Sequence, residues 1–412
     1  MMAQNSVRYR HIGLAILFAC ALGVSLRSGD SLRYSDESDY DQLARSLLHN
    51  HTFAFADGSP TAYRPPGYPG FIAAAYAIVQ RPATAKVENV LFLMLAALAL
   101  GIVARRLHPN GGSLTPFLIL GYPLLIYAAS LLYPQVLGCL LLTVTIMLIS
   151  GEQLSVRQAA IAGLVFGVLI LAIPYFVLLL PVLAAYVLFR RDLRRGDRMR
   201  KAIVLAGAAA LVVTPWTMRN YLEFHAMIPI SANGGWNLFI GNSPATTPNG
   251  SVASVDVTSL CKRVRPDMGI NQLDGALGKC AMDWISENPW TAIQLYVRKV
   301  INYFNFRNEL ATKNAASPWS DLLLFTTYYP LLMIAIVRAA LFRRFPLGRT
   351  EALIYVLYFA NALISAIYFT RIRFRIPFDF LLIAVAAGFL CSCWDARQER
   401  RQKNLRMDPI PE

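Results

Sequence analysis

The sequence predicts an all-α polytopic membrane protein of about ten transmembrane helices with further helices in its loops. Of its 412 residues, 56% are hydrophobic and 15% are charged, whereas a soluble globular chain carries about 25% charge. Charged residues gather in short patches that separate apolar runs of about 16–24 residues, close to the length that crosses a bilayer core. The net charge of +15 comes from basic residues that flank these runs, so we expect a membrane partner and no nucleic acid.

The apolar runs give the predicted spans in chain order. They are 11–27, 84–105, 114–131, 133–150, 158–173, 175–190, 201–217, 320–341, 351–369 and 376–393. Proline at Tyr133-Pro134 and at Pro174 predicts tight turns between paired helices. The first run shows no convincing small-residue cleavage site after it, so we expect it to remain as a span.

Basic residues predict the orientation of these spans. They cluster at 105–106, 190–201, 343–349 and 397–406, and with ten spans all four clusters lie on one face together with both termini. The positive-inside rule makes that face cytoplasmic, and we predict a bacterial inner-membrane protein. Its predicted parts are a first transmembrane helix (1–27), a first periplasmic loop (28–83), helices 2–7 (84–217), a large periplasmic loop (218–318), helices 8–10 (319–393) and a basic cytoplasmic tail (394–412).

The two predicted periplasmic loops contain helical patterns of their own. Apolar spacing over 36–50 predicts a helix on the membrane surface. The run 68–80 is too short to span and predicts a re-entrant, interfacial or buried helix. Residues 276–306 predict an amphipathic helix flanked by Pro289. Cys261 and Cys280 lie in the second loop, where an oxidising compartment permits a disulfide but the sequence does not decide whether they are bonded.

The first loop opens with a cluster of carboxylates, Asp36-Glu37-Ser38-Asp39-Tyr40-Asp41. Acidic residues at the start of a helix complement its dipole, and this alone would explain Asp36 and Glu37. A carboxylate just outside the membrane can also take a proton from an attacking hydroxyl. Asp36 and Glu37 are therefore our candidate catalytic residues.

Farther along the same loop lies Tyr63-Arg64-Pro65-Pro66-Gly67-Tyr68-Pro69. The two prolines restrict the backbone and favour the start of a helix, so they would hold Arg64 in one place. A fixed arginine near the bilayer suits a phosphate group through forked hydrogen bonds. The alternative is an interfacial arginine whose side chain reaches lipid headgroups.

Two later segments carry similar signals. Thr214-Pro215-Trp216-Thr217-Met218-Arg219-Asn220-Tyr221 leads into a stretch rich in glycine and asparagine at 230–242, which either binds a sugar through its amides or only packs on the helices. Between the last two spans, Arg371, Arg373 and Arg375 run against the positive-inside rule, and an anionic ligand would explain them. Asp379 is four residues from Arg375 and could pair with it.

Together these motifs resemble GT-C-fold glycosyltransferases, in particular the bacterial relatives of protein O-mannosyltransferases and of lipid A aminoarabinose transferases. The resemblance implies a polyprenyl-phosphate sugar as donor, Asp36 as the catalytic base and Arg64 at the donor phosphate. The Pro-Trp-x-x-Arg-Asn, Gly-Gly-x-Asn-Leu-x-x-Gly-Asn and Arg-x-Arg-Phe-Arg-x-Pro stretches are also similar to that group. This sequence departs from it at Asp379, where a second proline is frequent, and at Gln135, where many relatives are acidic.

We therefore expect an inverting glycosyl transfer on the periplasmic side to a glycan, lipid or protein acceptor. The expected phosphate-binding residues are Arg64, Arg219, Arg371, Arg373 and Arg375. The expected substrate contacts are Tyr40, Tyr63, Glu88, Asn220, Asn233, Asn237 and Asn242. No cofactor is required, because arginine neutralises the phosphate, although a divalent metal stays compatible. The alternatives are a lipid-linked glycan flippase or an O-antigen-type polymerase or ligase, and the transferase hypothesis requires Asp36, Arg64 and Arg373 to meet at one cavity open to the bilayer.

Overall fold

The computed structural model describes residues 2–248, 257–307 and 317–407. Within these ranges the regular structure is helical, with one isolated β-bridge between Ala54 and Pro60, which confirms the predicted all-α class. Residues 249–256 and 308–316 of the predicted loop 218–318, and residues 408–412 of the predicted tail, lie outside the described residues.

The helices follow one another with short connections. They are α1 (Met2–Ser28), α2 (Ser35–Asn50), α3 (Gly67–Tyr76), α4 (Pro82–Leu107), α5 (Gly111–Leu120), α6 (Leu124–Ala129), α7 (Gln135–Ile149), α8 (Val156–Ala172), the 3-10 helix η1 (Pro174–Leu179), α9 (Leu180–Leu188), α10 (Arg195–Phe224), α11 (Gly234–Gly241), α12 (Val257–Leu260), α13 (Ile270–Glu287), α14 (Pro289–Tyr303), α15 (Pro318–Ala340), α16 (Arg349–Tyr368) and α17 (Ile372–Met407).

The chain is a multi-pass membrane protein. Within the described residues, six helices are long and apolar enough to cross a membrane, namely α1, α4, α10, α15, α16 and α17. The other four predicted spans correspond to shorter apolar helices: α5 with α6, α7, α8, and η1 with α9. Helices α7 and α8 have 15 and 17 residues, fewer than the roughly 20 that an upright span needs.

The loop helices confirm two of the predicted patterns and correct the bounds of a third. Helices α2 and α3 occupy the stretches predicted at 36–50 and 68–80. The single helix predicted over 276–306 is instead two helices, α13 and α14, with Asn288 between them. Pro289 is the first residue of α14, a position that tolerates its missing N–H, whereas inside a continuous helix it would break the hydrogen-bond ladder.

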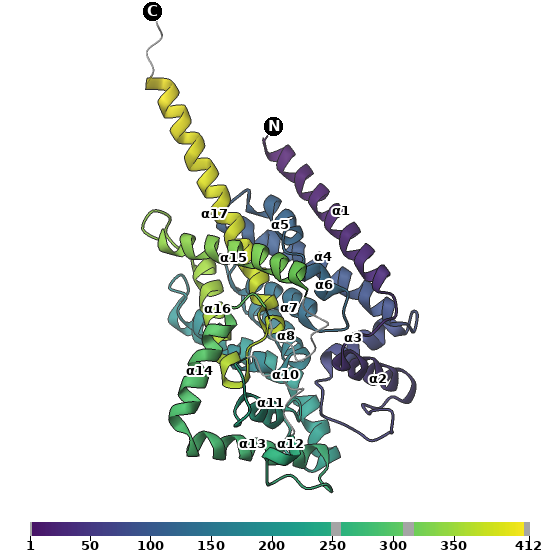
Figure 1. Ribbon diagram of the computed structural model, residues 1–412. Coiled ribbons are helices and arrows are strands. Elements are labelled where there is room, and N and C mark those ends of the chain that lie inside the picture. The colour runs from purple at the N-terminus through teal and green to yellow at the C-terminus, as the bar shows by residue number, and fades with distance from the viewer. Residues whose placement is uncertain (1, 249–256, 308–316, 408–412) are drawn as a thin grey trace, which may run out of the picture.

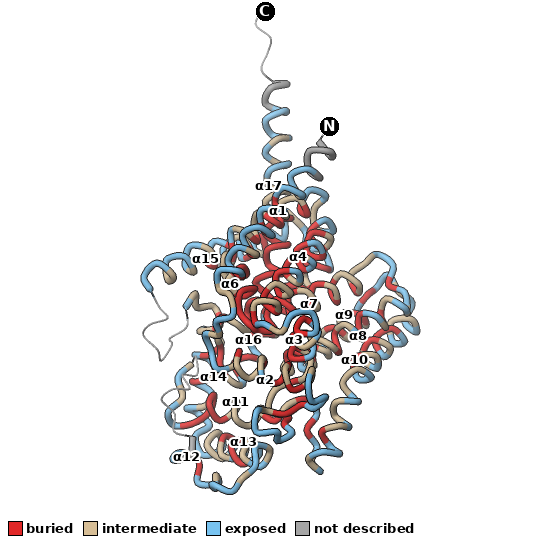
Figure 2. Tube along the Cα trace, turned by 90° about the vertical axis from the view of Figure 1, so that its right-hand side faces the viewer, coloured by how far each residue is buried: buried red, intermediate tan, exposed pale blue. Residues whose placement is uncertain are grey.

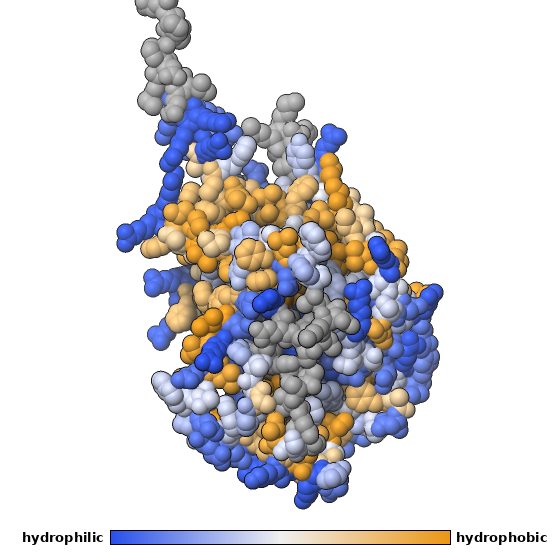
Figure 3. All heavy atoms as spheres, viewed as in Figure 1, coloured by the Kyte–Doolittle hydropathy of each residue, from blue (hydrophilic) through white to orange (hydrophobic). Residues whose placement is uncertain are grey.

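Figure 1 shows the two termini at one end of the molecule and α11–α13 at the opposite end, with α2 and α3 nearby. The buried residues concentrate where α4, α7 and the first half of α17 meet (Figure 2). Hydrophobic atoms form a band between the hydrophilic end of α17 and the hydrophilic end around α13 (Figure 3). Figures 1 and 2 also show α15 lying crosswise to α17. The loop helices therefore gather at the polar end that lies away from both termini.

Candidate active site

A cavity of about 390 Å³ lies between the first loop, α16 and the start of α17. We call it the arginine cavity, and its polar lining residues are Asp36, Tyr40, Arg64, Tyr133, Gln135, Tyr175, Ser231, Asn233, Asn237, Ser365, Tyr368 and Arg373. Its other wall is apolar and includes Ile173, Val177, Leu178, Ile364, Phe369 and Phe374. Val177 and Leu178 on η1 are 39% and 42% exposed, so the apolar wall continues to the outer surface of the helices.

Asp36 is the centre of the polar wall. Nη2 of Arg64 donates to its Oδ1 at 2.6 Å, and Nη1 of Arg373 donates to its Oδ2 at 2.6 Å. The hydroxyl of Tyr133 donates to the same Oδ2 at 3.1 Å. The structure thus brings Asp36, Arg64 and Arg373 together from three distant parts of the chain, as the transferase hypothesis requires.

The two arginines control the charge of the Asp36 carboxyl. Burial raises its pKa, but the positive charges of Arg373 and Arg64 outweigh that effect and hold the pKa well below its ordinary value. Burial lowers the pKa of the Arg64 guanidinium, but the surrounding tyrosines and carboxylates hold it above its ordinary value. Asp36 is therefore a carboxylate and Arg64 a cation throughout the physiological range.

Glu37 points away from the cavity and fixes the start of α2. It is fully buried, and its Oε1 accepts the backbone N–H groups of Arg33 and Tyr34 at 2.9 and 3.1 Å. Its Oε2 accepts the N–H of Leu132 at 2.9 Å. This contact brings the neighbouring Tyr133 to Asp36, so the geometry favours a structural role for Glu37 and leaves Asp36 as the candidate base.

Aromatic rings hold Arg64 in place. Its guanidinium lies over the rings of Tyr63 and Tyr40, 4.9 and 5.5 Å from their centroids, a cation–π arrangement. After the two prolines, a Cβ on Gly67 would lie 2.7 Å from the backbone of Ala172. Glycine is therefore required for α3 to pack closely against the end of α8, which borders the cavity.

Arg219 and Asn220 lie outside the cavity lining and join the two loops. Arg219 donates to the carbonyl oxygens of Thr61 at 3.0 Å and Phe53 at 3.3 Å. Asn220 is fully buried and donates to the carbonyl oxygen of Ile228 at 3.0 Å. The structure favours a supporting role for both residues rather than the predicted contacts with substrate.

The asparagines of the glycine-rich segment divide into two groups. Asn233 and Asn237 line the arginine cavity. Asn242 instead donates to the carbonyl oxygens of Leu238 and Ile367, both at 2.9 Å, and accepts from Lys299 at 3.0 Å. It therefore anchors the end of α11 to α16.

The remaining predicted arginines and the acid in α4 also lie outside the lining. Arg375 is buried and donates to Asp379 at 2.8 Å, the pairing that the sequence spacing predicts. Arg371 lies over the ring of Phe369 at 5.0 Å, and burial lowers its pKa to about 10. Glu88 is in α4 with its Oε2 buried. None of these three predicted residues is part of the cavity wall.

Two site residues were not recognised in the sequence. The sequence predicts only a tight turn at Tyr133, yet its hydroxyl contacts both Asp36 and Arg373. Asp39 is not among the predicted site residues, yet it accepts from Nη2 and Nε of Arg64 at 2.7 and 3.0 Å. The helical spacing of Asp36 and Asp39, with one turn between them, was the available signal for a shared partner.

The second loop is closed by a disulfide between Cys261 and Cys280. Cys261 lies just after α12 and Cys280 lies in α13, where they pack with Phe239 of α11. No group of three or more His, Cys, Asp or Glu side chains that could hold a metal ion is found within the described part of the chain.

Comparisons with known proteins place the fold. No protein-family profile matches the sequence, and no curated protein matches it. Among solved structures, the chain is similar to the apo form of the Archaeoglobus fulgidus oligosaccharyltransferase, with a TM-score of 0.58 and 12% identity over 98% of this chain and 52% of that chain. The archaeal oligosaccharyltransferase AglB from the same organism, in complex with an inhibitory peptide and a dolichol-phosphate, gives a TM-score of 0.54 and 12% identity over 97% of this chain and 52% of that chain.

The chain thus spans about half the length of the archaeal enzyme. It is also similar to ArnT from Cupriavidus metallidurans bound to undecaprenyl phosphate, with 16% identity over 90% of this chain and 77% of that chain, at a TM-score of 0.48. At these identities the comparisons establish the fold alone. The chain has the fold of GT-C membrane glycosyltransferases, as its motifs predict.

Proposed function

We propose that this chain is a glycosyltransferase that moves a sugar from a polyprenyl-phosphate donor to an acceptor hydroxyl on the periplasmic side of the membrane, with inversion at the anomeric carbon. One observation carries the proposal. The Asp36 carboxylate is held by Arg64 and Arg373 on the wall of a cavity whose opposite wall is apolar and continues to the outer helix surface.

The cavity suits the two halves of such a donor. Two guanidinium groups can bind a phosphate through charge-assisted hydrogen bonds. Nε of Arg373 is buried and has no hydrogen-bond partner within the described residues, and an unsatisfied buried donor favours an added acceptor such as a phosphate oxygen. The apolar wall along η1 suits the first prenyl units, which would enter from the bilayer.

The proposed reaction is a single displacement. The acceptor oxygen forms a bond to the anomeric carbon, while the bond between that carbon and the phosphate oxygen breaks. The electron pair of the broken bond leaves with the polyprenyl phosphate, and the proton of the acceptor hydroxyl passes to Asp36. Arg64 and Arg373 stabilise the charge that develops on the departing phosphate.

Donor binding would also prepare the base. Both arginines pair with Asp36, which makes the carboxylate a weak base. A phosphate competes for the same guanidinium groups, so its binding would weaken these pairs and raise the pKa of Asp36. The base would therefore become active only when a donor is present.

The test is transfer by the purified full-length protein. Short-chain polyprenyl-phosphate sugars are incubated with a cell-envelope glycan and lipid extract, and the release of free polyprenyl phosphate and the mass of the acceptor are followed by mass spectrometry. We expect Asp36→Asn to lower turnover by at least about 100-fold, the lower end for general base catalysis. The control is Asp57→Asn, an exposed carboxylate of the same loop that accepts hydrogen bonds from Ser59.

A folded Asp36→Asn protein with near wild-type turnover would show that Asp36 is not the general base. Arg373→Gln tests the phosphate site separately, because it should weaken binding of a polyprenyl phosphate without sugar. Its control is Arg265→Gln, at a side chain 67% exposed in the second loop. Equal binding by these two variants would contradict the proposed phosphate site.

A further inference from the structure

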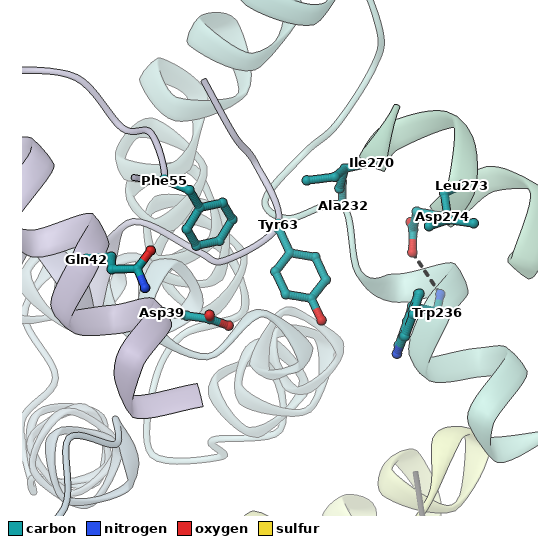
Figure 4. A pocket seen from close by; sticks show the side chains of 9 residues that line it. All are labelled: Asp39, Gln42, Phe55, Tyr63, Ala232, Trp236, Ile270, Leu273 and Asp274. Atoms are coloured by element: carbon teal, nitrogen blue, oxygen red, sulfur yellow. Dashed lines mark hydrogen bonds between the residues drawn. The ribbon is translucent and has the colours of Figure 1, made fainter. Parts of the chain in front are cut away.

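A second cavity of about 400 Å³ lies beside the arginine cavity, within the range of about 300–1,000 Å³ typical of small-molecule sites. We call it the acidic cavity, and it is lined by Asp39, Gln42, Phe55, Tyr63, Ala232, Trp236, Ile270, Leu273 and Asp274. Figure 4 shows Asp39 and Gln42 of α2 on one side, Trp236 of α11 and Asp274 of α13 on the other, and Tyr63 between them with its hydroxyl toward Trp236.

The two cavities share a wall. On α2, Asp36 lines the arginine cavity and Asp39, one turn later, lines the acidic cavity. On the first loop, Arg64 lines the arginine cavity and the adjacent Tyr63 lines the acidic cavity. The same Nη2 of Arg64 lies 2.6 Å from Asp36 and 2.7 Å from Asp39. A single guanidinium group therefore separates the candidate base from the acidic cavity.

The chemistry of the two cavities differs. The arginine cavity combines cations with an apolar wall, whereas the acidic cavity combines two carboxylates and an amide with aromatic rings. Its lining residue Ile270 is 43% exposed and belongs to α13, at the end of the molecule away from the termini (Figure 1). A ligand can therefore approach it from the aqueous side.

We propose that the acidic cavity binds a sugar ring of the acceptor, and that this ring is neutral or carries an amino group rather than a phosphate or carboxylate. The inference rests on the proposed function, which it deepens by naming the acceptor class as a glycan. It assigns Trp236, Tyr63 and Asp274 as acceptor-binding residues, on the opposite side of Arg64 from the donor.

The lining residues suit a sugar. Aromatic rings such as Trp236 and Tyr63 offer broad apolar faces for the C–H face of a pyranose. Carboxylate oxygens of Asp39 and Asp274 accept hydrogen bonds from hydroxyl or ammonium groups, and the Gln42 amide both donates and accepts. Arg64 balances the charge of Asp39, so the negative charge of Asp274 is the one that disfavours an anionic ligand.

The Asp274 side chain is held in the wall of the acidic cavity by a hydrogen bond. Its Oδ1 accepts the backbone N–H of Trp236 at 2.8 Å. Burial raises its pKa above the ordinary value, and this effect outweighs the backbone hydrogen bonds. A half-buried carboxylate of this kind gains from a ligand that supplies hydroxyl or ammonium donors.

The experiment measures saccharide binding to the full-length protein in nanodiscs by saturation-transfer-difference NMR. The probes are chitotriose, which is neutral, its de-N-acetylated form, which is cationic, and glucose 6-phosphate. We expect saturation transfer to the first two, stronger for the cationic trimer, and none to glucose 6-phosphate. Trp236→Ala and Asp274→Asn should each weaken binding by at least about fivefold through loss of the aromatic face or of the charge.

The matched controls are Trp319→Ala and Asp267→Asn. Trp319 is 80% exposed, and the Asp267 side chain is 75% exposed in the second loop. Equal binding by Trp236→Ala and wild type, no binding of either trimer, or preferential binding of glucose 6-phosphate would each overturn the inference.

A separate measurement distinguishes this inference from the proposed function. Polyprenyl phosphate binding depends on Arg373 and not on Trp236, so it is measured on the same samples. Absence of saccharide binding in the wild type, with intact polyprenyl phosphate binding, defeats the acceptor assignment alone. Absence of polyprenyl phosphate binding in the wild type defeats the proposed function.

Discussion

Three side chains from three parts of the chain determine what Asp36 can do. Arg64 and Arg373 neutralise its charge, and Tyr133 donates a hydrogen bond to it. Asp36 is thereby kept ionised in a buried place where an isolated carboxylate would take up a proton. The same contacts make its basicity depend on what else the arginines bind.

The pH dependence of catalysis follows from this arrangement. The pKa of Asp36 in the free protein lies below its ordinary value of about 4, whereas under the proposed function a bound donor phosphate would compete for both arginines. We therefore expect the acid limb of kcat, which reports the bound complex, to lie at higher pH than the acid limb of kcat/KM. Steady-state kinetics with a short-chain donor between about pH 4 and pH 8 would check this, and coincident limbs would contradict it.

The lowered pKa of Asp36 also determines how the stability of the fold depends on pH. A carboxylate whose folded pKa is lowered stabilises the fold above its unfolded pKa of about 4 and loses that contribution as pH falls through the folded value. Thermal unfolding of wild type and Asp36→Asn should therefore differ by a constant amount between about pH 6 and pH 8. A difference that changes with pH over this interval would exclude the ion pairs as its source.

Tyr133 provides a test of positioning. Tyr133→Phe removes a hydrogen bond to the Asp36 carboxylate while the ring stays, and we expect turnover to fall about 10- to 100-fold, the range for one hydrogen bond to a charged group. Tyr127→Phe is the matched control, because its hydroxyl bonds to Tyr34 rather than to Asp36. A change in kcat with little change in KM would separate positioning from a general loss of structure.

The sequence allowed part of this site to be predicted. Asp36, Arg64 and Arg373 were found because each lies in a recognisable local pattern. Tyr133 was missed because its position depends on the contact of Glu37 with Leu132, which joins segments 95 residues apart. Arg219 is predicted to bind phosphate because the sequence shows its charge. The sequence does not show that its guanidinium group donates hydrogen bonds to the carbonyl oxygens of Thr61 and Phe53 instead.

At the scale of elements, the close approach of α11 and α13 shapes the acidic cavity and one edge of the arginine cavity. A Cβ on Gly235 would lie 1.9 Å from the carbonyl oxygen of Asp274, so the two helices pack backbone against backbone. The disulfide Cys261–Cys280 closes the same unit. These contacts hold Trp236 and Asp274 facing α2.

A pair of glycine variants tests this packing. Gly235→Ala forces the helices apart and should destabilise the protein by about 1–3 kcal/mol, the usual cost of overpacking. Gly275→Ala adds a methyl group with nothing within 4 Å and should be neutral or stabilising by up to about 1 kcal/mol, because alanine favours a helix. Thermal unfolding in detergent measures both, and equal melting temperatures would show that α11 and α13 do not pack so closely.

Hydrophobic patterns predicted the positions of the helices better than their lengths and end residues. Every predicted span coincides with a helix or a pair of helices, since apolar composition alone marks them. The hydrophobic pattern could not show that α7 and α8 are short. A helix packed against other apolar helices needs the same apolar residues as a helix that faces lipid. Pro289 was the available signal for the break at Asn288, because proline favours the first position of a helix. The sequence-based prediction placed Pro289 beside one continuous helix instead.

For the whole molecule, the start of α1 and the end of α17 lie at one end (Figure 1). Helices α2 and α11, which lie toward the other end, contribute lining residues to both cavities. The charge pattern predicts that the first end is cytoplasmic. Introduced cysteines can test this in intact cells with a membrane-impermeant thiol reagent. We expect Ser59→Cys, in the first loop, to be labelled directly and Glu399→Cys, near the end of α17, to be labelled only after permeabilisation. The reverse pattern would invert the predicted orientation.

The pairing of Asp36 with both arginines also bears on how a catalytic cycle would end. Under the proposed reaction the lipid departs as a phosphate monoester, which carries a charge of about −1.5 to −2 near pH 7, whereas the donor diester carries a single charge. Arg64 and Arg373 would hold this spent carrier more tightly than fresh donor, so product inhibition is expected. Asp36 then competes with the carrier for the same two cations, and its return to them would help to empty the enzyme for the next turnover.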